Sequence, residues 1–384
     1  MGGTWLIKNS WLTHWYEWRA QRIADPIERL RYLRCATLPR SPYATRHPGR
    51  WGLIALAALG IVLIPLRNSG MVHARSGLDR RLPLPGPLTP EQEMVQIWQV
   101  ERKQGYEVYS NGLRIETGSE VANEPRKPGV FDLDGRRIVT GTTDPVGIVY
   151  HTTESPTPRF EATENERLRH VAEGIKGYVA RIHAYHYLID RFGRVHRIVR
   201  EQDAAWHAGA SVWADAGQIY VNLNHSFLAV AFESETRRGD EIPETVTPAQ
   251  VHAARTLTDL LRSKYRILAL NCATHAQVSV NPDNFRIGNH TDWAANFPFT
   301  EIGLPDNYAR PLASMYAFGF GYNHDFVGLT GSRLWKGLAA SEERIRHEAT
   351  AQGLSVAAYR ALLQQKYRKT LAALAQAQLT EGPL

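Results

Sequence analysis

The sequence predicts an α/β fold in which a mixed central β-sheet is flanked by helices. The continuous apolar run Phe227–Phe232 is typical of a strand buried on both faces, as parallel strands usually are. Residues 184–189 and 195–199 are predicted to be strands joined by a turn at Asp190–Gly193, which makes an antiparallel hairpin. Thr247 and the proline that follows it predict a helix over residues 247–266.

Shorter patterns predict the remaining elements. Gly147–His151 is an apolar run of the strand type that ends in polar residues. The capping-box pattern at Thr163–Glu166 predicts a helix that ends near Glu173, just before a glycine. A short helix is expected around Glu91–Lys103, followed by hairpins and turns. The C-terminal region is predicted to be helical, with two helices separated by a break at residues 353–355.

Composition excludes several classes of protein. The chain has 384 residues, of which 43% are hydrophobic and 22% charged, and these values are ordinary for a globular protein. The two cysteines, Cys35 and Cys272, are too few for a disulfide scaffold. The formal net charge is +7, but residues 1–50 alone hold nine Lys or Arg against three acidic residues. The rest of the chain is therefore nearly neutral, and we expect no nucleic-acid partner.

An uncharged segment, Trp51–Leu66, follows this basic leader. As a helix it would span about 24 Å, slightly less than the hydrocarbon core of a membrane. The cationic residues before it predict that the N-terminal side is cytoplasmic and that the remaining chain lies outside. We expect a single-pass anchor in the inner membrane. The alternative is a signal sequence cleaved after Val72–Ala74, followed by export.

The predicted domain organisation has six parts. The boundaries follow the changes in charge, hydropathy and Pro/Gly content along the chain. They are a basic cytoplasmic leader (1–50), a transmembrane or signal segment (51–66), a Pro/Gly linker (67–90), a helix and hairpin extension (91–144), an α/β domain (145–310) and a helical C-terminal region (311–384).

Two histidines are candidates for a metal site. His151 lies at the end of a predicted buried strand, where its side chain can emerge from the sheet. His290 lies far away in the sequence, in the segment Gly288–Trp293. Two histidines plus a carboxylate or thiolate can leave one coordination position open, which catalytic zinc requires.

Five ordered segments together resemble the zinc-dependent N-acetylmuramoyl-L-alanine amidases of the type 2 family. Phage amidase-lysozymes and peptidoglycan recognition proteins share the fold of this family. The resemblance covers about residues 145–310 and is specific because the segments occur in the same order. The segments are Ile148–His151, Ala184–Arg194, Ala205–Gly209, Val230–Glu235 and Asn289–Trp293.

The resemblance implies roles for individual residues. His151 matches the first zinc ligand of the family and His290 the second. Glu233 matches the carboxylate that several of these amidases use as general base beside the zinc ion. Tyr185 matches a tyrosine that contacts the metal-bound water or the substrate carbonyl in the phage branch. The pair Trp206 and His207 matches a loop that lines the substrate groove.

The third zinc ligand departs from the family pattern. The family usually supplies a cysteine or aspartate shortly after the second histidine, but here those positions are Pro298–Thr300, which cannot bind zinc. We expect Asp306 to take this role, with Glu301 as the next candidate. His275 together with Cys272 is a third option, because a Cys-x-x-His sequence can chelate a metal.

The resemblance implies zinc-dependent hydrolysis of the amide bond between N-acetylmuramic acid and L-alanine. The substrate would be peptidoglycan or its muropeptides, with Glu233 as the base and Tyr185 or His207 holding the oxyanion. The alternative is a peptidoglycan-binding protein of the same fold that does not cut. For the C-terminal helices, we expect either a helical hairpin packed on the domain or an accessory module that binds the cell wall.

Overall fold

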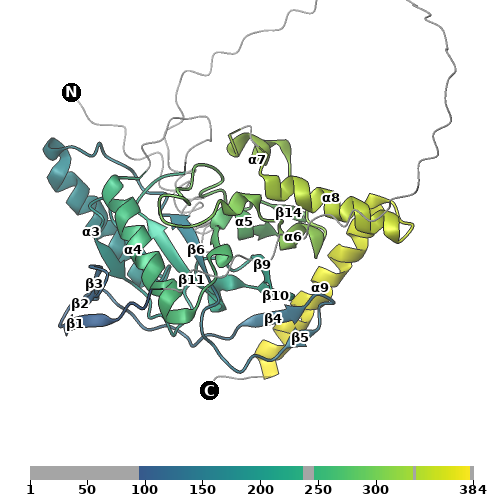
Figure 1. Ribbon diagram of the computed structural model, residues 1–384, viewed down its shortest axis with the longest axis horizontal. Helices are drawn as coiled ribbons and strands as arrows, with labels where there is room; N and C mark the ends of the chain where they lie inside the picture. Colours follow the sequence, from purple (N-terminus) through teal and green to yellow (C-terminus); the bar gives the residue numbers. More distant parts are fainter. Residues whose placement is uncertain (1–94, 237–245, 332–333, 381–384) are drawn as a thin grey trace, which may run out of the picture.

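The computed structural model describes residues 95–236, 246–331 and 334–380. Its largest sheet is mixed and has the strand order β1-β2-β3-β8-β7-β11-β6-β12 (Figure 1). The predicted mixed sheet flanked by helices is thereby confirmed. The strands of this sheet are β1 (Gln99–Lys103), β2 (Tyr106–Tyr109), β3 (Arg114–Glu116), β6 (Gly147–Thr152), β7 (Tyr187–Ile189), β8 (Val195–Arg197), β11 (Phe227–Phe232) and β12 (Cys272–Thr274).

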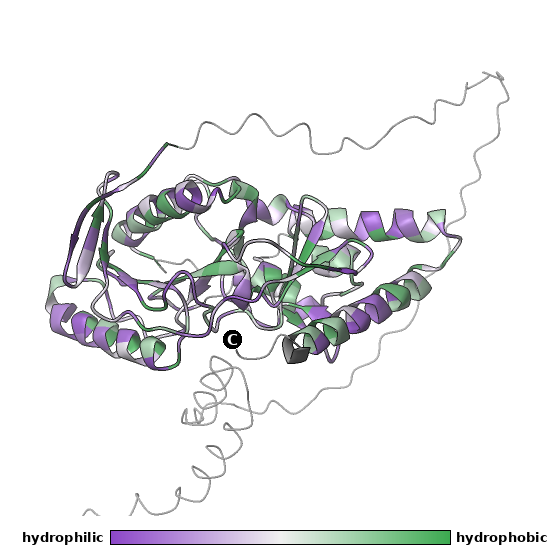
Figure 2. Cartoon of the chain, turned by 90° about the horizontal axis from the view of Figure 1, so that it is seen from below, coloured by the Kyte–Doolittle hydropathy of each residue, from purple (hydrophilic) through white to green (hydrophobic). Residues whose placement is uncertain are grey.

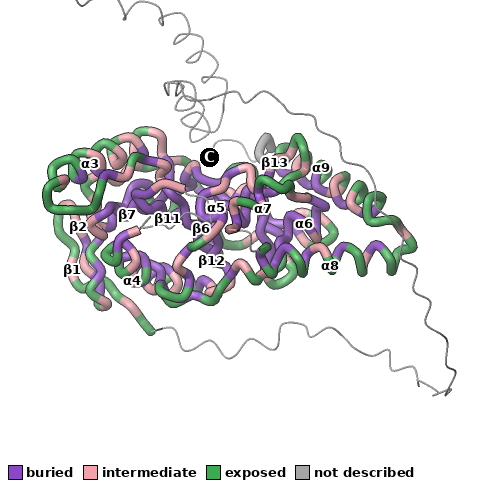
Figure 3. Tube along the Cα trace, turned by 90° about the horizontal axis from the view of Figure 1, so that it is seen from above, coloured by how far each residue is buried: buried purple, intermediate pink, exposed green. Residues whose placement is uncertain are grey.

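Parallel strands form the centre of this sheet. β6 lies between β11 and β12 and is parallel to both, and β7 is parallel to β11 on its other side. Every residue of β6 and β11 is buried, which explains their continuous apolar sequences. Figure 3 shows that buried residues concentrate around β6, β7 and β11. The predicted hairpin is confirmed, because β7 and β8 pair antiparallel across the turn at Asp190–Gly193.

Two helices cover opposite faces of the sheet. Val230 and Phe232 of β11 share a core with α4 (Pro248–Tyr265), whereas Ala231 shares one with Val179 of α3 (Asn165–Arg181). Successive residues of a strand point to opposite faces, so these contacts place the two helices on the two sides. The helix predicted at residue 247 is confirmed, because Thr247 and Gln250 form a capping box at its first turn.

The predicted limits of α3 were wrong. A short 3-10 helix, η1 (Ala162–Glu164), precedes α3, and no side chain caps its N-terminus. The helix also continues through Gly174 and Gly177 to Arg181. Leu168, Ala172 and Val179 are buried along its length, so tertiary packing outweighs the low helix propensity of glycine.

A second, antiparallel sheet lies beside the first and has the order β5-β4-β10-β9. Its strands are β4 (Gly129–Asp132), β5 (Arg137–Ile138), β9 (Val212–Asp215) and β10 (Gln218–Val221). The C-terminal helices are α6 (Ala313–Tyr316), α7 (His324–Leu329), α8 (Lys336–Ala351) and α9 (Val356–Thr380). Hydrophilic and hydrophobic residues alternate along the helices (Figure 2).

The C-terminal helices form a hairpin that packs on this second sheet. Leu338 of α8 and Tyr367 of α9 belong to the same buried core as Phe131 of β4 and Ile219 of β10. The break between α8 and α9 lies where predicted, at Gly353, whose φ of +66° suits glycine. The expected helical hairpin packed on the domain is therefore present, and binding of the cell wall by these helices stays a prediction.

The remaining elements are short. They are η2 (Leu223–His225), η3 (Ala269–Asn271), α5 (His275–Val278), β13 (Val280–Asn281), β14 (Arg286–Ile287) and η4 (Asn307–Ala309). Most of them connect the central strands to the C-terminal region. They carry several of the residues described below.

The helix expected around Glu91–Lys103 was wrong for the part that the structure describes. Gln99–Lys103 is strand β1, which pairs antiparallel with β2. Gly105 has a φ of +90° in the tight turn between them, a conformation that glycine adopts without strain. Pairing across this turn joins β1 to a large sheet, which outweighs a weak local helix pattern.

The predicted leader, the segment Trp51–Leu66 and the linker lie outside the described residues. Among the residues that are described, no helix is both long and apolar enough to cross a membrane.

Candidate functional site

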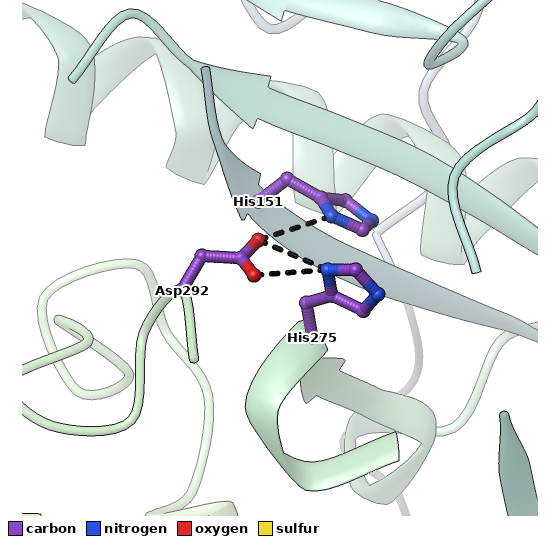
Figure 4. A group of neighbouring side chains, drawn as sticks. All are labelled: His151, His275 and Asp292. Atoms are coloured by element: carbon purple, nitrogen blue, oxygen red, sulfur yellow. Dashed lines mark hydrogen bonds and ion pairs between the residues drawn. The ribbon is translucent and has the colours of Figure 1, made fainter. Parts of the chain in front are cut away.

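Three buried metal-binding side chains meet at one edge of the central sheet (Figure 4): His151, His275 and Asp292. His151 is the second-last residue of β6, and His275 follows β12 directly. Because β6 and β12 are parallel with Thr274 opposite Tyr150, both imidazoles emerge at the carboxyl ends of adjacent strands. Ligand sites of open α/β sheets form at this edge. Asp292 reaches the same point from the loop after β14.

The distances in this cluster suit a metal ion. Asp292 Oδ1 lies 2.9 Å from His275 Nδ1, and Asp292 Oδ2 lies 3.2 Å from His151 Nδ1. The three ligand atoms all lie within 4.8 Å of one another. A tetrahedral zinc ion with ligands at about 2.0–2.2 Å places neighbouring ligand atoms about 3.3 Å apart. The donor set of two imidazoles and a carboxylate therefore fits zinc with one position left open.

The protonation states in the cluster also suit a metal. Burial alone would raise the pKa of Asp292, but the neighbouring rings of His275 and His151 hold it well below its usual range. Burial lowers the pKa of His275, which keeps its ring neutral. An ionised carboxylate and neutral imidazoles are the forms that bind zinc.

The structure brings together only part of the predicted ligand set. His151 belongs to the cluster, and so does His275, which was expected only as a third option for the last ligand. His290 is buried but is not in the cluster; its ring stacks on that of His275 with centroids 4.4 Å apart. Asp306 is exposed, and its side chain accepts a hydrogen bond from Tyr308 N at the start of η4. Asp306 is thus a helix cap in this structure.

Glu301 and Cys272 also lie outside the cluster. Glu301 is exposed and accepts a hydrogen bond from the hydroxyl of Thr300. Cys272 is buried in β12, and burial raises the pKa of its thiol to about 12, so it stays protonated. A thiol in that state is a poor metal ligand.

Asp292 is the residue that sequence reasoning missed. It lies two residues after His290, the histidine that was predicted to be the second ligand. The residues next to Asp292 in the sequence do not distinguish a metal-binding carboxylate from an ordinary solvent-exposed one. For His275 a signal did exist, because it directly follows a short apolar segment that could have been recognised as a strand.

Glu233 is a buried carboxyl group near this edge. It follows β11 directly, and since Ala231 pairs with His151, Glu233 lies two residues further along the same face. Its Oε2 accepts a hydrogen bond from Arg191 N at 3.1 Å, while Oε1 is buried with no hydrogen-bond partner among the described residues. Burial raises the pKa of Glu233 to about 7. A carboxyl group with this pKa can gain and lose a proton near neutral pH.

The other predicted site residues surround His151. The ring of Tyr185 lies 5.0 Å from that of His151, and its hydroxyl donates to Thr152 O. Tyr185 precedes β7 and has a φ of +60°, so it is not the strand residue that was expected. His207 Nδ1 lies 3.1 Å from His151 Nε2. Burial, together with the neighbouring imidazoles, lowers the pKa of His207 well below its usual range.

Trp206 lies farther from the cluster. It is partly exposed, and its ring meets that of His225 edge-on at a centroid distance of 6.3 Å. Its backbone N–H donates to His183 O, which fixes the start of the loop that carries His207. The loop is further held by Asn224, whose Oδ1 accepts from His207 N at 2.8 Å.

Comparisons with known proteins point to one family. Residues 141–294 match the family model described as N-acetylmuramoyl-L-alanine amidase, and all three residues of the metal cluster lie within this match. No curated protein matches the sequence.

Several solved structures resemble parts of the chain. The N-acetylmuramoyl-L-alanine amidase LysC from Clostridium intestinale is 23% identical, with 49% of this chain and 93% of that chain covered and a TM-score of 0.26. AMPDH3 from Pseudomonas aeruginosa, in complex with anhydromuramic pentapeptide, is 21% identical over 50% of this chain and 74% of that chain, with a TM-score of 0.30. Drosophila peptidoglycan recognition protein SD is 16% identical over 42% and 84%, with a TM-score of 0.25. TM-scores this low carry no argument about this chain.

Proposed function

We propose that the chain is a cell-wall amidase of the type 2 N-acetylmuramoyl-L-alanine amidase family and that it uses zinc; the family match over residues 141–294 supports this. It would hydrolyse the amide bond between N-acetylmuramic acid and L-alanine in peptidoglycan or muropeptides. The observation that carries the proposal is the buried cluster of His151, His275 and Asp292, which lies inside the matched segment.

These three residues would hold the zinc ion. When bound, zinc supplies Lewis-acid polarisation of a carbonyl group and activation of water at neutral pH. The cluster fits this role because its donors converge from three separate segments and are almost completely buried. A site assembled in this way holds its geometry before substrate arrives, and this reduces the reorganisation that catalysis would otherwise require.

Glu233 would move the proton in the reaction. At a pKa of about 7, a large fraction of its carboxyl groups is ionised and able to accept a proton from water. The protonated acid can then deliver that proton to the leaving amine of L-alanine. Its Oε1 is the free acceptor for this transfer, whereas the hydrogen bond from Arg191 N to Oε2 fixes the orientation of the carboxyl group.

A peptidoglycan-binding protein without activity is the competing function. A protein of this fold that binds peptidoglycan without cutting it is expected to lack a complete set of zinc ligands. Here the third donor is supplied by Asp292, so the departure at Pro298–Thr300 does not leave the cluster incomplete. A purified protein without stoichiometric zinc that still binds murein would favour the binding function.

One experiment tests activity, substrate and metal together. Purified protein is incubated with murein, with and without a chelator, and the released peptides are identified by mass spectrometry. Free stem peptides that disappear with chelator and return when zinc is added are the expected result. Intact murein in every condition would contradict the proposal. Asp292→Ala is the inactive control, and Asp306→Ala is its matched variant at a carboxylate outside the cluster.

We propose further that the domain acts outside the cytoplasmic membrane. The support comes from the sequence: a basic leader precedes the uncharged segment Trp51–Leu66, a pattern that keeps the leader inside. Reporter fusions after residue 90 check this, since a reporter active only in the cytoplasm should be silent there. Activity of that reporter would contradict the topology.

A further inference from the structure

His207 forms a hydrogen bond with His151, at the ring nitrogen of His151 that faces away from Asp292. Its Nδ1 lies 3.1 Å from Nε2 of His151, and the other nitrogen of His151, Nδ1, lies 3.2 Å from Asp292 Oδ2. The His151 ring therefore has a carboxylate of the cluster beside one nitrogen and a second imidazole beside the other. The two rings meet at an interplanar angle of 84°.

Hydrogen bonds to Asn224 hold the backbone around His207. Asn224 Oδ1 accepts hydrogen bonds from both His207 N and Ala208 N, at 2.8 and 2.6 Å. His207 and Asn224 are both buried. The backbone that carries the His207 ring is thus held by hydrogen bonds that do not involve the metal cluster.

A neutral imidazole has one N–H and one acceptor nitrogen, so each ring in this pair can take two tautomers. If His151 keeps its proton on Nδ1, that proton points at Asp292 and blocks the nitrogen that faces the cluster. If the proton is on Nε2, Nδ1 presents its lone pair to the cluster and the N–H points at His207. Only the second arrangement leaves His151 able to bind a metal through Nδ1.

We infer that His207 is a positioning residue that accepts the Nε2–H hydrogen bond of His151 and thereby selects its metal-binding tautomer. Metal-binding histidines usually donate their second N–H to a carboxylate, a carbonyl or water, and here an imidazole takes that place. The His207 proton must then lie on Nε2. That atom is buried and has no hydrogen-bond partner among the described residues, so within them the ring makes its hydrogen bond through Nδ1.

The inference rests on the metal site of the proposed function, but its test does not require amidase activity. Zinc affinity of the full-length protein is measured by competition with a chromophoric chelator. His207→Leu removes the acceptor and should lower the affinity about 10–100-fold, the range found for such outer partners. His207→Asn places an amide oxygen near the position of Nδ1 and should stay within about threefold of the wild type.

His225→Leu is the matched control. His225 is also a buried imidazole and packs against Trp206 in the same region, but its Nδ1 accepts from Lys127 N rather than from a ring of the metal cluster. This variant should bind zinc as the wild type does. If His207→Leu also binds with wild-type affinity, the inference is wrong.

A second measurement needs no variant and so does not depend on folding of the mutants. In the zinc-loaded wild type, labelled with ¹⁵N-histidine, the ring nitrogen shifts report the tautomer. We expect His151 protonated on Nε2 and His207 protonated on Nε2. A zinc-loaded protein in which His207 carries its proton on Nδ1 would overturn the inference, whether or not the enzyme cuts murein.

Discussion

His275 and His290 lie in parallel, with ring centroids 4.4 Å apart and an interplanar angle of 18°, yet of the two only His275 belongs to the metal cluster with Asp292. The two imidazoles are so close that a metal site could be assigned to either on proximity alone. The position of Asp292 decides between them, because its carboxylate lies 2.9 Å from His275 Nδ1 and 3.2 Å from His151 Nδ1.

His275→Ala should remove zinc binding, whereas His290→Ala should leave it largely intact. Loss of one of three ligands costs more than the roughly 10–100-fold typical of an outer partner, because a coordination bond is lost outright. Zinc content after dialysis, measured by atomic absorption, distinguishes the two. A zinc-free His290→Ala protein that is still folded would place His290 among the ligands.

Asp292→Asn and Asp306→Asn form a matched pair. They test whether the third zinc ligand is Asp292, as the structure indicates, or Asp306, as the sequence predicted. The first replaces a buried anion between two imidazoles by a neutral amide, so zinc affinity should fall by at least about 10-fold. The second changes a cap at the start of η4, where the cost to stability is about 1 kcal/mol or less. Isothermal titration with zinc gives both affinities, and equal losses in the two variants would contradict the assignment.

Glu233→Gln should keep zinc binding and lose most of the turnover. General acid–base catalysis contributes typically about 10²–10⁴-fold, and glutamine cannot exchange a proton. The measurement is the initial rate of stem-peptide release, compared at equal zinc content with the wild type. Full activity of Glu233→Gln would remove this residue from the mechanism.

The raised pKa of Glu233 also predicts a pH dependence of stability. Its folded pKa of about 7 exceeds the usual value of 4.5, so the folded state holds this proton more tightly. Stability from this group is complete below pH 4.5 and is lost as the pH rises through about 7, with an upper bound of about 3 kcal/mol.

Urea unfolding of the metal-free protein across this pH range tests the sign. The difference in free energy of unfolding between the wild type and Glu233→Gln should fall from pH 4.5 to about 7 and then level off. Subtraction of the variant removes the contributions of other titrating groups, provided that they are far from Glu233. A difference that rises with pH would mean that the carboxyl group is ionised in the folded state well below neutral pH.

Sequence patterns predicted two kinds of element correctly. One kind is stabilised by contacts between residues close in the sequence, and the other is buried along its whole length. The run Phe227–Phe232 is a strand because all six residues are buried, and Thr247 starts a helix because its side chain and that of Gln250 cap the first turn. By contrast, Gln99–Lys103 becomes a strand through pairing with β2, which joins it to a larger sheet. A short stretch of sequence around Gln99–Lys103 does not show that this segment will pair with β2.

The site divides in the same way. The sequence by itself determined that His151 lies at the end of a buried strand and that Glu233 follows another, because strand ends and burial follow from local hydropathy. Only the tertiary structure decided that His275 and Asp292, rather than His290 and Asp306, meet His151. Coordination depends on where side-chain atoms lie to within about an ångström, and the pairing of distant strands and loops sets those positions.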